Sequence, residues 1–174
     1  MALHVVIWCV AVTQACHMHR AAFPILRVVD GDTVSFAAPF LPAPLNTSLS
    51  LRVRGIDCPG MHLYVAWHKG ASATESGYRA KCEMEATLAA AATNITRSLI
   101  DTHSRSDTAL QICAWDKYGA RVLGDVVFWS GDGVHTSLAD VLVHTGHAVP
   151  YTGHVIRHDW CASPAVCSDA TLDG

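Results

Sequence analysis

Charged side chains are scarce in this 174-residue chain, and glutamate is the scarcest of the acidic types. Only 16% of the residues are charged and 51% are hydrophobic, which excludes a disordered chain and a charge-rich coiled coil. The net charge is −3, so the chain lacks the basic excess of proteins that coat nucleic acid. Three of the fifteen acids are glutamate: Glu75, Glu83 and Glu85. Few residues could therefore serve as a glutamate proton acceptor.

Long hydrophobic runs are also missing. The apolar stretch at residues 2–15 is shorter than the roughly 20 residues of a membrane-spanning helix, so no stable membrane span is expected. Its length and the small residues after it are typical of a signal peptide, although no Lys or Arg precedes it. A leader at 1–15, which would make the protein secreted or periplasmic, and a buried N-terminal strand both stay open.

Several metal and nucleophile motifs are absent as well. The seven cysteines include no CxxC pair and no standard zinc spacing, and there is no Gly-x-Ser-x-Gly elbow. Loss of a leader through Ala15 would leave six cysteines, which fits an oxidising compartment but allows 15 pairings. The late histidines are broken up by Gly and Pro and are more typical of solvated loops than of a zinc site.

The pattern of apolar residues predicts strands first, then a helix, more strands and a second helix. Strands are expected at residues 24–29, 33–38, 49–56, 109–115 and 121–129, and helices at 79–100 and from 137 to about 146. Asp30 and Gly31 form a hairpin signal, because glycine tolerates the positive φ of such turns. The order of elements predicts one α+β domain around a small barrel, over residues 24–161, with a tail at 162–174.

Three short clusters place charged groups at strand ends or turns, at residues 30–33, 52–59 and 116–121. Carboxylates suit a hard divalent cation, and the planar fork of arginine suits phosphate oxygens. Taken singly, each cluster is more typical of an ordinary turn, a solvated strand face or a loop. Their order and spacing together are much more specific.

In this combination the chain resembles the staphylococcal nuclease (thermonuclease) family. The matching segments are residues 29–34, 51–59 and 116–124, with a weaker likeness at 141–148. The resemblance implies a five-stranded OB-like β-barrel with packed helices. It also implies a monomeric, calcium-dependent phosphodiesterase that hydrolyses DNA and RNA with low sequence specificity, the 5′-oxygen being the leaving group.

The resemblance assigns the calcium ligands to Asp32, Asp57 and the backbone carbonyl of Cys58. It assigns the catalytic, phosphate-binding arginines to Arg52 and Arg121. Arg121 stands one residue late in its motif, so a bulge at Ala120 would be needed to keep its side chain on the expected face.

The resemblance further places Lys117, Tyr118 and Tyr151 at the substrate. The main departure is Gly60, which stands where the family has a glutamate proposed as the general base. Since a general base contributes about 10²–10⁴ in rate, a slowed enzyme is expected, with recruitment of Glu75 an open alternative. The other function class is an inactive nuclease-like module that binds nucleic acid or protein.

Overall fold

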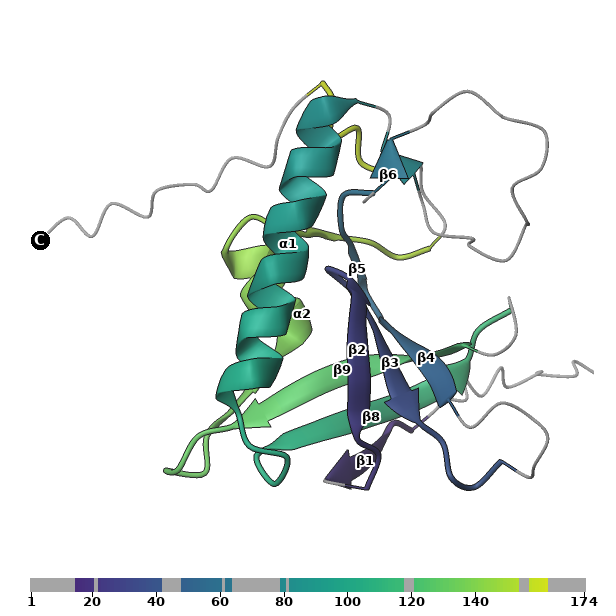
Figure 1. Cartoon of the computed structure of the whole chain (residues 1–174), viewed down its shortest axis with the longest axis vertical. Helices are drawn as coiled ribbons and strands as arrows, with labels where there is room; N and C mark the ends of the chain where they lie inside the picture. The colour runs from purple at the N-terminus through teal and green to yellow at the C-terminus, as the bar shows by residue number, and fades with distance from the viewer. Residues whose placement is uncertain are drawn as a thin grey trace, which may run out of the picture.

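The computed structural model describes residues 15–20, 22–41, 48–60, 62–63, 79–80, 82–117, 121–153 and 157–162. Within them the fold is α+β, as predicted, with a large sheet and two helices (Figure 1). The large sheet consists of β1 (His17–Arg20), β2 (Ile25–Asp30), β3 (Thr33–Ala37), β4 (Ser48–Val53), β8 (Thr108–Trp115), β9 (Arg121–Trp129) and β10 (His135–Ser137). Two short pairs join β5 (Ile56–Asp57) to β11 (Val149–Pro150) and β6 (His62–Leu63) to β7 (Arg79–Ala80). The helices are α1 (Glu83–Thr102) and α2 (Leu138–His144).

The described large sheet does not close into a barrel, so of the expected five-stranded OB-like β-barrel with packed helices the structure shows the α+β class, a multi-strand sheet and two helices. Its strand order is β1-β8-β9-β4-β3-β2, with β10 paired to β9. Closure would require β2 to reach the outer edge of β8. That edge is already paired with β1, in a register that sets His17 opposite Ile112, and the Cys16–Cys113 disulfide fixes this pairing.

The pairing of β4 with β9 is the only parallel one in the described large sheet and joins the two halves of the fold. Its register sets Ser50 opposite Arg121 and Arg52 opposite Leu123. Alternate residues of β4, including Leu51 and Val53, are buried in the core. The side chains of the other residues, Arg52 among them, therefore project from the opposite face of the sheet.

Helix α1 lies beside the sheet, and its buried face includes polar residues. Met84 is 41% exposed, whereas Glu85, Thr93 and Thr96 are buried. The polar residues are tolerated inside because each has a partner; the Thr96 hydroxyl, for example, donates to the Gly31 carbonyl at 2.6 Å. Apolar spacing alone could not predict these buried polar residues, although Ala92, Ile95 and Leu99 do pack in or against the core.

The predicted start of the second helix at residue 137 is confirmed. Ser137 is the N-cap of α2 and its hydroxyl accepts the Asp140 N–H at 3.1 Å. Gly146 follows the helix with a φ of 72°. Leu138 and Leu142 are fully buried, so α2 adds its apolar face to the core beneath β9.

Gly31 is needed for a different reason from the one predicted. The turn residues between β2 and β3 are Gly31 and Asp32, because Asp30 pairs with Thr33. Gly31 does not have a positive φ. A Cβ at this position would instead lie 2.7 Å from the Ala92 Cβ and 3.1 Å from the Cys58 Sγ. Close approach of the turn to α1 therefore requires glycine here.

A second disulfide, Cys82–Cys161, ties the start of α1 to the segment at 157–162, and Cys58 is a buried free thiol. Cys9 and Cys167 lie outside the described residues. Among the helices of the described ranges, none has both the length and the apolar character required to cross a bilayer.

Candidate charged site at the end of strand β4

Asp32 is held at its position by three neighbouring segments. The residue lies in the β2–β3 turn, and its carboxylate is buried with 1% exposure. Its Oδ2 accepts the Cys58 N–H at 3.0 Å, and its own backbone carbonyl accepts the Val53 N–H at 2.8 Å. The turn, the end of β4 and the chain after β5 are thereby brought together around one carboxylate.

Arg52 bridges the two aspartates that the sequence singled out. Its Nη1 lies 2.5 Å from Asp32 Oδ1, and its Nη2 lies 3.1 Å from Asp57 Oδ1. Asp57 is fully buried in β5, where its backbone pairs with Val149 of β11. The three residues come from separate sequence motifs, and the fold brings all of them to one place.

Arg157 is a fourth member of this cluster, and sequence reasoning did not find it. Its Nε donates to Asp57 Oδ2 at 2.8 Å, its Nη2 also contacts Asp57 Oδ1, and the same Nη2 lies 3.5 Å from the Cys58 carbonyl oxygen. Arg157 is an isolated arginine outside every motif, 100 residues from Asp57. The usable signal was its position three residues before Trp160, which is buried and anchors this segment.

The charges in the cluster balance. Two carboxylates face two guanidinium groups, so their formal charges cancel. For Arg52, burial acts to lower the pKa, but the carboxylates of Asp32, Asp30 and Asp57 outweigh it and raise the pKa. Asp30, next to the turn, has its pKa raised to about 7, by burial first and then by the charge of Asp32. Above this pH the cluster therefore gains one more negative charge.

The oxygen donors expected to bind calcium are of the right chemical type, because carboxylate and carbonyl oxygens are its preferred ligands. Their arrangement does not fit a bound calcium ion, however. Both oxygens of Asp57 accept from Arg157, and both oxygens of Asp32 also have donors. The guanidinium of Arg157 lies against Asp57 and the Cys58 carbonyl, the two neighbouring ligands that a cation would share. Within the described ranges, this cluster included, no group of three or more His, Cys, Asp or Glu side chains is arranged to hold a metal ion.

Arg121 lies on the same face of the sheet as Arg52. Ser50 and Arg52 alternate with buried residues on β4, and Arg121 is opposite Ser50 on the neighbouring parallel strand. Its Nε and Nη2 each lie 2.5 Å from Asp116 Oδ2. Ala120, where a bulge was expected, lies outside the described residues. The irregularity seen in this hairpin falls instead between Ile112 and Ala114.

The expected substrate residues are placed differently from one another. Lys117 is exposed at the end of the β8 strand. Tyr151 is half-buried, and its backbone N–H donates to the Gly55 carbonyl at 2.8 Å, next to the turn that precedes Asp57. Tyr118 lies outside the described residues.

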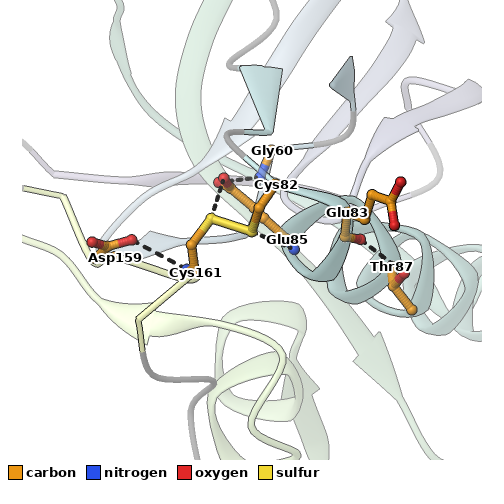
Figure 2. Close-up of a disulfide and its surroundings, with 7 residues drawn as sticks. All are labelled: Gly60, Cys82, Glu83, Glu85, Thr87, Asp159 and Cys161. Atoms are coloured by element: carbon orange, nitrogen blue, oxygen red, sulfur yellow. Dashed lines mark hydrogen bonds between the residues drawn. A yellow bond between two sulfur atoms is a disulfide. The ribbon is translucent and has the colours of Figure 1, made fainter. Parts of the chain in front are cut away.

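Glu85 is the carboxylate at Gly60, as Figure 2 shows. The Gly60 N–H donates to Glu85 Oε1 at 3.1 Å, and Glu85 Oε2 lies 3.9 Å from the Cys161 sulfur of the disulfide. The side chain is 1% exposed. A carboxylate buried in this way holds the backbone of residue 60 in place and is not presented to solvent water. Glu75, the alternative proton acceptor, lies outside the described residues.

Comparison of the chain with protein-family models and with curated proteins yields no match in either case. The candidate site therefore depends on the convergence of Asp32, Arg52 and Asp57, together with Arg157.

Proposed function

We propose that the chain is a phosphodiester hydrolase on an OB-like scaffold, acting on DNA or RNA. The observation that carries the proposal is the Arg52 guanidinium, which two buried carboxylates from separate segments hold in one orientation. Guanidinium groups stabilise charge that develops on phosphoryl oxygens, and they do so best when their position is fixed before the substrate binds.

In this proposal Arg52 and Arg121 bind the substrate. Asp32 and Asp57 hold Arg52 in position. The Arg52 side chain is 20% exposed, whereas that of Asp32 is only 1% exposed. A guanidinium has five N–H donors, and Asp32 and Asp57 use only part of this capacity. Arg121, on the same sheet face, adds a second positive group. Together they would orient a phosphate for attack by water.

The chain is expected to hydrolyse phosphodiesters more slowly than enzymes of this class that have a general base. Residue 60 carries no side-chain carboxylate, and Glu85 beside it is buried and bonded to the backbone. A missing general base lowers the rate by about 10²–10⁴, whereas the electrostatic contribution of the arginines remains.

The test is cleavage of single-stranded DNA by Arg52→Lys, compared with wild type and with Arg54→Ala. Lysine keeps the charge but loses the fork, so the rate should fall by about 10²-fold, while the exposed turn residue Arg54 should be dispensable. Circular dichroism verifies folding of each variant. Unchanged cleavage by Arg52→Lys would refute the assignment.

A second candidate is a module that binds nucleic acid without cleaving it. Two exposed aromatic side chains, Trp115 (63%) and Phe40 (55%), border one surface hollow of about 210 Å³ and offer faces on which bases can stack. Binding of single-stranded DNA that Trp115→Ala weakens, with no cleavage under any condition, would favour this function. For either function we propose a secreted or periplasmic location, which the two disulfides support.

A further inference from the structure

Arg157 occupies the place that a calcium ion would take beside two oxygen donors of the type that calcium prefers. Asp57 and the Cys58 carbonyl are adjacent hard-oxygen donors, and a single side chain contacts both of them. That side chain is itself a cation. The interaction is a paired one, with Nε on one Asp57 oxygen and Nη2 on the other, the geometry in which arginine binds carboxylates most strongly.

We propose that Arg157 is an internal cation that competes with divalent cations for Asp57 and the Cys58 carbonyl. A calcium ion binds there only in molecules from which the Arg157 side chain has moved away. The inference rests on the proposed function for the role of this site, but competition between the two cations is a property of the binding equilibrium alone.

The surroundings favour this exchange over a permanent ion pair. Asp57 is fully buried, so it requires a positive partner, and loss of Arg157 without a replacement would leave buried charge poorly compensated. Arg157, by contrast, has 26% of its side chain exposed. After its departure Arg52 would still bridge Asp57 and Asp32.

Anchors close to Arg157 explain why it returns to the site. Trp160 is buried three residues later, and Cys161 is bonded to Cys82 at the start of α1. These two links anchor the backbone beside Arg157, so the exchange we propose is a rotation of the Arg157 side chain. In this exchange the Arg157 side chain moves, while the backbone that carries it stays in place.

Calorimetric titration with calcium, without substrate, tests the competition. Minor conformations populated at about 0.1–10% weaken apparent binding by the same fraction, so Arg157→Ala should bind calcium about 10- to 1,000-fold more tightly than wild type. Arg54→Ala is the matched control and should bind as wild type does. Adding Asp57→Asn to Arg157→Ala should remove the gain. Equal calcium binding by wild type and Arg157→Ala, including no binding by both, overturns the proposal.

A measurement on the unmodified chain covers the case in which Arg157→Ala does not fold. The Arg157 Nε–H resonance, assigned by its disappearance in Arg157→Lys, should shift as calcium is added, because its bond to Asp57 breaks. A resonance that does not respond overturns the proposal. Competition in a chain without nuclease activity would refute the proposed function alone, whereas nuclease activity without competition would refute this inference alone.

Discussion

Replacement of Gly31 by alanine should destabilise the fold by steric conflict alone. Gly31 does not have a positive φ, so alanine can adopt its backbone conformation. The new Cβ would nevertheless lie 2.7 Å from the Ala92 Cβ, whereas carbon atoms in contact normally lie about 3.5–4.0 Å apart. The conflict of roughly 1 Å must be relieved by moving either the turn or the helix.

Neither partner moves freely. Ala92 is fully buried on α1, and Thr96, one turn later, binds the Gly31 carbonyl. Overpacking at such a place costs about 1–3 kcal/mol in the free energy of unfolding. Gly131 offers the matched control, because it has no positive φ and nothing lies within 4 Å of a Cβ built there. Gly131→Ala should be neutral or stabilise by up to about 1 kcal/mol.

Urea unfolding of the two variants measures both values, and a double mutant isolates the contact. Ala92→Gly alone should cost about 1 kcal/mol in helix propensity, but in the Gly31→Ala background it also removes the clash. The double mutant should therefore be more stable than the sum of the single effects predicts, by about 1 kcal/mol or more. Strict additivity, or a cost for Gly31→Ala no larger than that of Gly131→Ala, would refute the steric explanation.

Three further expectations concern buried polar groups and the disulfide of the sheet. Burial raises the pKa of Asp125 despite its hydrogen bonds, so the folded state retains this proton longer than the unfolded state does. The free energy of unfolding of wild type, relative to that of Asp125→Asn, should therefore fall as pH rises above the ordinary carboxyl pKa, by at most about 1.4 kcal/mol per pH unit. Urea titrations at several pH values measure this difference, and a constant difference would contradict the prediction. Thr96→Val should cost about 1–3 kcal/mol, because it leaves a buried carbonyl unpaired, whereas the exposed Thr102→Val should cost far less. Serine at both Cys16 and Cys113 should lower stability by about 2–4 kcal/mol in thermal unfolding, and an unchanged melting temperature would show that β1 needs no covalent link.

Local signals predicted the elements well. The strand at Arg121–Trp129 and the cap at Ser137 follow from alternation and from side-chain chemistry, which act within a few residues. The buried polar residues of α1 did not follow, because Glu85 and Thr96 are buried through partners on other elements. The pairing of β1 with β8 was not predicted for the same reason, because it joins segments that are distant in sequence.

The candidate site, too, was predicted only in part from the sequence. The resemblance pointed to Asp32, Arg52 and Asp57, and the fold places them in contact. It gave no indication of Arg157, because a single arginine outside any motif carries no local pattern. Motifs record the residues that a family shares, whereas a charge partner from the end of the chain becomes apparent only once the chain is folded.

The separation of 100 positions between Asp57 and Arg157 also sets an order of events during synthesis. The aspartate leaves the ribosome long before its arginine, and β4 must wait for β9 to form their parallel pair. A growing chain thus holds an acidic group that is destined for burial but still lacks its full set of cations. Acquisition of Arg157 is therefore expected among the last steps of folding, after the sheet has formed.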